Sequence, residues 1–246
     1  GALGVPEFGT DFAMQMLIDT KPKYFSDLVR IAGLAHGTDV WLGNAQTLIQ
    51  EGKATIQTAI CTRDDIMTYL IHTGVEDGMA FNIMEKVRKG LVAKGKVPQW
   101  EEWKETMKQA GVPDWYIESC GKIKYMFPKA HAVAYVMMAF RIAYFKVYYP
   151  LAYYAAFFSI RAKAFDYELM CQGRERLETT MKDYKKRLSA KQLSPKEEAA
   201  YGDMKIVQEM YARGFEFLPI DVYKSKATKF QIVDGKLLPP FSSIDG

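Results

Sequence analysis

Cations and aromatic rings share one stretch of this sequence that contains no acidic residue. Between Glu118 and Asp166 there is no Asp or Glu, although the whole chain has 29 of them. Phosphate groups are bound by cations, and unpaired bases stack on aromatic rings. The stretch therefore indicates a surface for nucleotides or nucleic acid, or else a buried pair of aromatic helices whose lysines extend to water. Its cations are Lys122, Lys124, Lys129, Arg141, Lys146, Arg161 and Lys163.

A helix predicted to begin at Lys129 gives this stretch a more specific chemistry. The first N–H groups of a helix bind anions, and three lysines precede or open this helix where acidic residues would normally be favoured. We therefore expect a bound anion at this end. His131 and Tyr135 are four residues apart and share one helix face, which places a possible phosphate ligand one turn before a flat ring. A tyrosine with no ligand is the simpler reading of Tyr135 by itself.

Composition excludes several other classes of protein. The chain is 49% hydrophobic and 25% charged, as is usual for a globular protein that is not disordered. Its three cysteines and three histidines are far apart, so neither a disulfide scaffold nor a histidine-bound metal is expected. Residues 130–149 are strongly apolar but contain Arg141 and Lys146, which disfavour a membrane span. We expect a cytoplasmic protein without a membrane partner, and the net charge of +4 suits a polyanionic partner.

Capping and periodicity predict a mainly α fold with a small β region near the C-terminus. We expect Ser26 to cap a helix that ends at Gly33, and Thr62 with Asp65 to form a capping box. Pro150 should stop the helix that begins at Lys129. The predicted helices cover residues 10–19, 26–32, 62–74, 76–89, 100–109, 113–121, 129–149, 151–160, 166–188 and 194–214. Asp234-Gly235 between two apolar runs predicts a β-hairpin, with strands at 229–233 and 236–238.

The residues around Lys129 also resemble a known family. Lys122-Ile-Lys-Tyr-Met-Phe-Pro-Lys-Ala-His-Ala-Val-Ala-Tyr135 and the segment Arg141–Pro150 are similar to the fingers of bacterial C-family replicative DNA polymerases, specifically the PolC type. Further similar stretches are residues 4–10, 31–46, 63–67, 83–90 and 239–241. The resemblance covers nearly the whole chain, and residues 90–105 depart from it as an insertion would.

This resemblance implies roles for individual residues. It places Lys129 and His131 on the triphosphate of an incoming deoxynucleotide, Tyr135 at the base, and Phe127 in the wall of the pocket. Further nucleotide contacts are expected from Lys122, Lys124, Arg63, Arg88 and Lys89. Contacts with template–primer DNA are expected from His36, Thr38, Asn44, Arg141 and Lys146, with a structural role for His36 as an alternative.

The resemblance also implies parts that this sequence does not supply. Family members hold Mg²⁺ with palm carboxylates, but the sequence has no D-x-D motif, and Asp64-Asp65 is better read as a first helical turn. We therefore expect no catalytic residue in this chain and no activity of the chain alone. The expected partners are template–primer DNA, the deoxynucleoside triphosphate and the rest of the polymerase, with a sliding clamp bound only through a part beyond residue 246.

Three functional parts are expected along the chain. Residues 1–165 should form the nucleotide- and DNA-contacting fingers, residues 166–214 an outer helical part, and residues 215–246 a small β segment that leads into a duplex-binding domain. A non-catalytic helical module that binds nucleic acid is the alternative function. The two functions differ in one requirement. Only the polymerase function requires that a nucleoside triphosphate compete with other ligands for the helix start at Lys129.

Overall fold

The computed structural model describes residues 1–244, and the chain is mainly helical, as the sequence predicts. It divides into two compact units, residues 1–140 and residues 141–246, and the division falls inside helix α8. The sequence placed a functional division after residue 165 instead. The assignment of functional parts at 165 and 214 stays a prediction.

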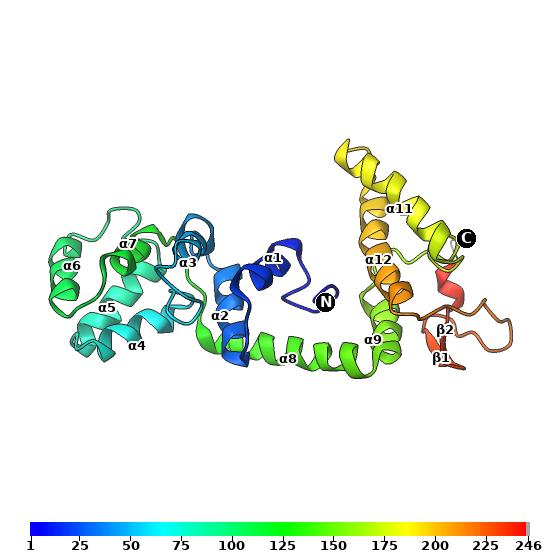
Figure 1. The fold of residues 1–246 in the computed structure, drawn as a ribbon, viewed down its shortest axis with the longest axis horizontal. Coiled ribbons are helices and arrows are strands. Elements are labelled where there is room, and N and C mark those ends of the chain that lie inside the picture. Colours follow the sequence, from blue (N-terminus) through cyan, green and yellow to red (C-terminus); the bar gives the residue numbers. More distant parts are fainter. Residues whose placement is uncertain (245–246) are drawn as a thin grey trace. The chain divides into compact units, whose positions relative to one another are not determined.

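The first unit is built from helices that pack around one apolar core. Ile31 and Leu34 on α2, Ile66 and Leu70 on α4, and Ile83 on α5 are all at most 1% exposed, and α4 packs directly against α5 (Figure 1). The elements of this unit are α1 (Asp11–Thr20), α2 (Phe25–His36), the π-helical turn Trp41–Ala45, α3 (Gln46–Gln50), α4 (Arg63–His72), α5 (Asp77–Arg88), α6 (Trp100–Gln109), α7 (Asp114–Lys122) and the first part of α8 (Lys129–Tyr148).

Side-chain caps mark several of the helix starts. The Thr10 side chain accepts a hydrogen bond from the Ala13 N–H at the start of α1. Thr62 and Asp65 form the predicted capping box of α4, and the Glu76 carboxylate accepts two N–H groups at the start of α5. Each cap satisfies backbone donors that have no partner within the helix.

The limits predicted for the second helix are wrong. Helix α2 begins at Phe25, where Asp27 rather than Ser26 completes the cap, and it continues through Gly33 to His36. A Cβ at position 33 would lie 2.6 Å from the Cys61 carbonyl oxygen, so Gly33 allows close helix–loop packing instead of ending the helix.

The segment before α6, part of the stretch interpreted from the sequence as an insertion, also packs onto the unit. Residues 90–99 form turns that bury Val92 and Val97, and α6 then begins at Trp100 as predicted.

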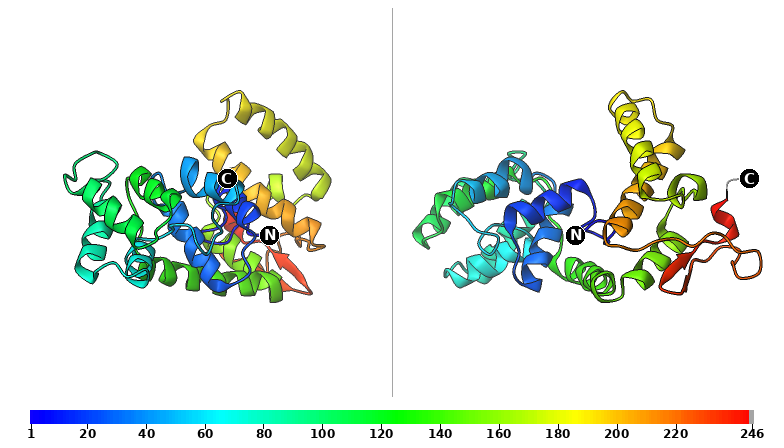
Figure 2. Two further views of the ribbon diagram at one scale, coloured as in Figure 1. Left: turned by 60° about the vertical axis from the view of Figure 1, so that its left-hand side comes forward. Right: turned by 45° about the vertical axis from the view of Figure 1, so that its right-hand side comes forward.

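The second unit combines helices with the predicted β-hairpin. Figure 2 shows α11 and α12 lying side by side in two further views, in agreement with their contacts. The expected single helix over 166–188 is wrong, because Gly173 at φ 97° separates α10 from α11. After the end of α8, the elements are α9 (Pro150–Ala156), the π-helical turn Phe157–Arg161, α10 (Tyr167–Met170), α11 (Arg174–Ser189), α12 (Pro195–Ala212), β1 (Gln231–Val233), β2 (Lys236–Leu238) and a 3-10 turn at Phe241–Ser243.

The hairpin forms at the predicted turn. Strands β1 and β2 pair antiparallel with Val233 opposite Lys236, and both Asp234 and Gly235 have positive φ, as a type I′ turn requires. Strand β1 begins at Gln231, two residues later than expected. Beside the hairpin, the rings of Phe158, Phe165, Phe217 and Phe230 contact one another and form an aromatic core.

Within residues 1–244, no helix has the length and apolar character needed to cross a lipid bilayer.

Candidate nucleotide-binding site

Four rings follow one another beside the start of α8. His36 contacts Phe127 with ring centroids 5.0 Å apart, Phe127 contacts His131 at 5.0 Å, and His131 contacts Tyr135 at 4.7 Å. We call these residues the ring ladder. Tyr135 is 40% exposed and His131 is also exposed, while a side-chain hydrogen bond with Glu7 holds His36 in place. The structure thus brings three predicted nucleotide contacts and one predicted DNA contact into one accessible row.

The start of α8 already has an acidic partner. The Lys129 N–H donates to Asp64 Oδ2 over 2.8 Å, and Lys129 Nζ lies 3.9 Å from Asp65 Oδ1. Both carboxylates come from the first turn of α4. The sequence near residue 129 has no acidic residue, but the fold brings two carboxylates of α4 to this helix start. The lysines there therefore do not by themselves require a bound anion. An incoming phosphate would have to compete with Asp64 for this N–H group.

The loop before α8 is held by backbone hydrogen bonds to three other segments. Thr38 N–H donates to Tyr125 O over 2.9 Å, Arg63 N–H donates to Phe127 O over 3.3 Å, and Met126 N–H donates to Arg88 O over 3.3 Å. These bonds place the predicted contacts Thr38, Arg63 and Arg88 against the segment that leads into Lys129. Three segments that are far apart in the sequence therefore meet at the loop before α8.

Several of the predicted phosphate ligands are paired within the protein. Lys124 Nζ lies 2.7 Å from Asp39, and Lys122 Nζ donates to the Gly43 carbonyl over 3.2 Å. Both lysine side chains remain exposed. They can exchange these partners for a phosphate at little cost, because exposed ion pairs contribute only about 0 to 1 kcal/mol.

The Glu85 carboxylate on α5 binds Arg88 and Lys89, the two predicted nucleotide contacts at the end of that helix. Glu85 binds Arg88 through two side-chain hydrogen bonds and lies 2.9 Å from Lys89 Nζ. These hydrogen bonds from the Arg88 and Lys89 side chains lower the pKa of Glu85 to about 2, so Glu85 is ionised at neutral pH. Arg88 is half-buried and is thus better placed to anchor the loop than to receive phosphate.

The structure buries two of the predicted DNA contacts. Asn44 is 2% exposed and its amide binds the Ser119 carbonyl and hydroxyl groups. Lys146 is also 2% exposed, with Nζ 2.7 Å from Glu209 Oε1. Both side chains serve the interior of the fold, so the expectation that they face DNA is corrected. The burial of Lys146 could not be predicted from the sequence, because the aromatic residues around it are compatible with either a surface or a core.

Arg141 keeps the exposed position that its predicted role requires. Around it, α8 leaves a row of large apolar side chains exposed: Met137, Met138, Phe140, Tyr144, Phe145, Val147 and Tyr148. Most side chains of α8 are thus exposed and Lys146 is buried, while binding of nucleotides or nucleic acid by the exposed part stays a prediction.

Sequence reasoning missed the residues that support the ladder. Glu7 orients His36, and Asp64 occupies the α8 start from 65 residues away. No local spacing signals either contact. Within residues 1–244, no cluster of three or more His, Cys, Asp or Glu residues is arranged to hold a metal ion.

Comparison with known proteins agrees with the resemblance in the sequence. Residues 1–111 match the family model of the bacterial DNA polymerase III alpha subunit finger domain. Over all 246 residues, the chain is 55% identical to DNA polymerase III PolC-type of Streptococcus suis, 53% to that of Streptococcus pneumoniae and 52% to that of Streptococcus thermophilus. The chain spans 17% of the length of each of these relatives. The chain is therefore similar over its whole length to one part of the bacterial DNA polymerase III alpha subunits of the PolC type, and its residues 1–111 match their finger domain.

Proposed function

We propose that this chain binds the triphosphate of an incoming deoxynucleotide and the template–primer during DNA synthesis. The observation that carries the proposal is the exposed ring ladder beside the start of α8. Residues 1–111 of the chain match the finger-domain model, and the PolC-type relatives are similar over the whole chain, the ladder included. Lys129 and His131 would face the phosphates, and Tyr135 would face the sugar or base, one helical turn further on. Phe127 would form the wall between them.

Exchange of partners at Lys129 would accompany binding. The helix N-terminus and the Lys129 ammonium group now face Asp64 and Asp65. A triphosphate carries more negative charge than one carboxylate, and it can accept charge-assisted hydrogen bonds from both groups at once. Fixed donors of this kind stabilise the charge that develops during nucleotidyl transfer.

The chemical step would depend on groups outside this chain. Mg²⁺ held by palm carboxylates would supply the metal chemistry in the intact enzyme, and this chain would position the nucleotide. Contacts with the sliding clamp and much of the duplex would likewise come from other parts of the polymerase. We place this work in the cytoplasm, where bacterial DNA is replicated.

We therefore expect the chain alone to incorporate no nucleotide. The reason is that its sequence has no D-x-D pair to hold two metal ions. Primer extension with Mg²⁺ and all four triphosphates checks this, with a full-length PolC-type polymerase as the positive control. Extension that follows the purified chain through chromatography would refute the division of roles.

Tyr135→Ala in a full-length polymerase that contains this segment should weaken nucleotide selection. Loss of ring stacking should remove about 1 to 3 kcal/mol of binding free energy. The loss should appear as a higher KM or as weaker discrimination between nucleotides. DNA binding should be nearly unchanged, because Tyr135 carries no charge. Steady-state kinetics with correct and incorrect nucleotides measures this, and Tyr223→Ala, which removes a fully solvated ring, is the control. Equal losses for both variants would argue against a site at Tyr135.

DNA binding by this chain should depend steeply on salt. Each neutralised phosphate contributes a slope of about 0.9 in a plot of log affinity against log salt for duplex DNA. Arg141→Ala should lower that slope by about 1 without regard to sequence. Arg176→Ala, which removes another exposed arginine, is the matched control. Fluorescence anisotropy measures both, and affinity that stays constant as salt rises would show that the acid-free stretch does not bind DNA.

A further inference from the structure

An open cavity of about 490 Å³ lies in the first unit next to Lys129. Its volume falls in the range of sites for small organic ligands. No member of the ring ladder lines it, so it is distinct from the proposed triphosphate site, with which it shares only Lys129. Its lining residues are Arg30, Gln57, Thr58, Ala59, Asp65, Thr68, Tyr69, His72, Trp115, Tyr116 and Lys129.

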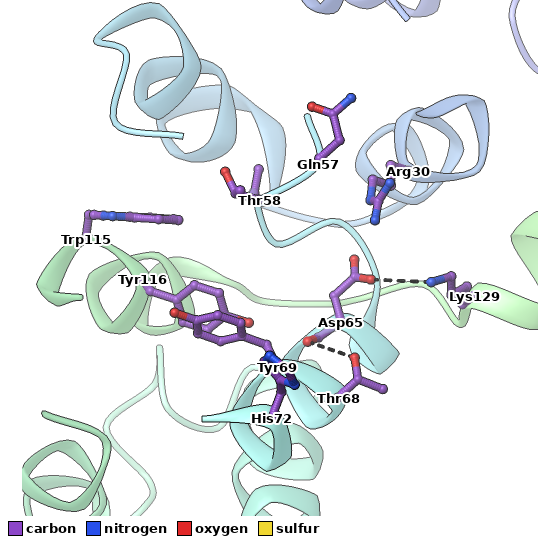
Figure 3. A pocket seen from close by; sticks show the side chains of 11 residues that line it. Arg30, Gln57, Thr58, Asp65, Thr68, Tyr69, His72, Trp115, Tyr116 and Lys129 are labelled. Carbon is purple, nitrogen blue, oxygen red and sulfur yellow. Dashed lines mark hydrogen bonds and ion pairs between the residues drawn. The ribbon is translucent and has the colours of Figure 1, made fainter. Parts of the chain in front are cut away.

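One part of the cavity wall is aromatic. Tyr69 on α4 and Tyr116 on α7 pack with ring centroids 4.4 Å apart, and Trp115 meets Tyr116 edge to face at 5.6 Å. Figure 3 shows Trp115 at one end of the cavity and the cations Arg30 and Lys129 at the other, with both tyrosine rings between them. The distribution suits a ligand with a flat ring at one end and a negative charge at the other.

The hydroxyl of Tyr116, one of the lining residues, is buried and has no hydrogen-bond partner among the described residues. Tyr116 as a whole is 2% exposed. Burial raises the pKa of Tyr116, so the phenol stays protonated and can donate. A buried hydroxyl without a partner costs free energy, and a ligand could recover that cost only after a small movement that opens the hydroxyl to the cavity.

The cations keep donors available for an anion. Arg30 Nη1 lies 3.8 Å from Asp27 Oδ1, and that carboxylate already accepts from Lys23 N–H, Tyr24 N–H and the Gln57 amide. The single carboxylate in the cavity wall is similarly occupied, because Asp65 Oδ2 accepts the Cys61 and Thr62 N–H groups. The cavity wall itself therefore carries two cations and one carboxylate, and the Asp27 carboxylate lies beside Arg30.

We infer that this cavity is a second nucleotide site, in which a base lies on the Trp115–Tyr116–Tyr69 wall and a phosphate lies between Arg30 and Lys129. Cations combined with stacking rings are what nucleotide binding requires. The bound group is either a free nucleotide or one unpaired nucleotide of a single strand, since both present the same base and phosphate. The inference rests on the cavity and does not depend on the role proposed for the ring ladder.

Titration of this chain with deoxyadenosine monophosphate and with a twelve-residue oligothymidylate tests the inference, followed by ligand-observed NMR. We expect saturable binding that Arg30→Gln and Trp115→Leu each weaken about tenfold or more. Arg30→Lys should retain most of the binding because it keeps the charge. The matched controls Arg176→Gln and Trp103→Leu remove an exposed arginine and a half-buried tryptophan that do not line the cavity, and they should bind as the original chain does.

The two probes separate the two sources of the nucleotide. Binding of the monophosphate alone assigns the site to free nucleotides, and binding of the oligonucleotide alone assigns it to a strand. No saturable binding of either probe would overturn the inference, as would equal binding by the original chain and Arg30→Gln. Thermal melting of each variant checks folding, and Arg30→Gln compared with Arg30→Lys decides the result if Trp115→Leu unfolds.

The same titration separates this inference from the proposed function. Tyr135→Ala should leave monophosphate binding unchanged, because Tyr135 does not line the cavity. Failure of the Tyr135 kinetics would contradict the ring-ladder proposal and leave the cavity result intact. A loss of monophosphate binding in Tyr135→Ala would instead show that the probe binds at the ladder, and it would refute the second site.

Discussion

Replacement of Lys129 by alanine in a full-length PolC-type polymerase that contains this segment should lower kcat/KM. The expected loss of transition-state stabilisation is about 2 to 4 kcal/mol. This is the scale of one preorganised donor that stabilises charge in the transition state. The side chain is half-exposed and holds Asp65 only loosely, at 3.9 Å, so it is free to turn toward a phosphate. Single-turnover kinetics on a primed template measures the loss.

Lys108→Ala is the matched control for this substitution. Its side chain is similarly exposed and lies 3.8 Å from Asp114, but Lys108 is on α6 and belongs to neither proposed site. We expect its kcat/KM to be unchanged. If Lys129→Ala keeps full kcat/KM while its melting temperature falls, Lys129 is a structural residue and the phosphate assignment is wrong.

Lys146→Met should lower the free energy of unfolding of this chain by about 2 to 4 kcal/mol. The buried ammonium group pairs with Glu209 at 2.7 Å and lies 5.6 Å from the centroid of the Tyr153 ring. Its removal leaves the partly buried Glu209 carboxylate without its cation, and loss of one partner of a buried pair is strongly destabilising. Urea unfolding followed by circular dichroism measures the change.

Two further variants show whether the effect comes from the buried pair. Lys205→Met removes a half-exposed lysine on α12 and should change stability by less than about 0.5 kcal/mol. Glu209→Gln combined with Lys146→Met should recover part of the loss, because no unpaired charge then remains. Stability of Lys146→Met equal to that of the original chain would show that the pair contributes nothing, and reduced DNA affinity of the folded variant would restore the original expectation for Lys146.

Local signals predicted most of the elements in this fold. The capping box of Thr62 and Asp65 marks a helix start that the structure confirms, and Asp234-Gly235 gives the hairpin. These features depend on residues a few positions apart, which a sequence displays directly. The errors arise where glycine has two uses, since Gly33 allows close packing inside a helix and Gly173 separates two helices.

The candidate site was less accessible to sequence reasoning, because its partners come from distant segments. The motif around Lys129 identified His131, Tyr135 and Phe127, which the structure places in one ladder. It could not show that Asp64 occupies the helix start, or that Glu209 pairs with Lys146. A count of charged residues along one segment misses the carboxylates that another helix brings next to it in the fold.

The binding position of the triphosphate is the central claim, and one structure tests it most directly. A full-length PolC-type polymerase that contains this segment should be determined with a primed template and an unreactive deoxynucleoside triphosphate analogue. We predict phosphate oxygens within about 3 Å of the Lys129 and His131 nitrogens, and the Tyr135 ring against the sugar or base. A triphosphate bound elsewhere, with Lys129 N–H still donating to Asp64, would contradict the account.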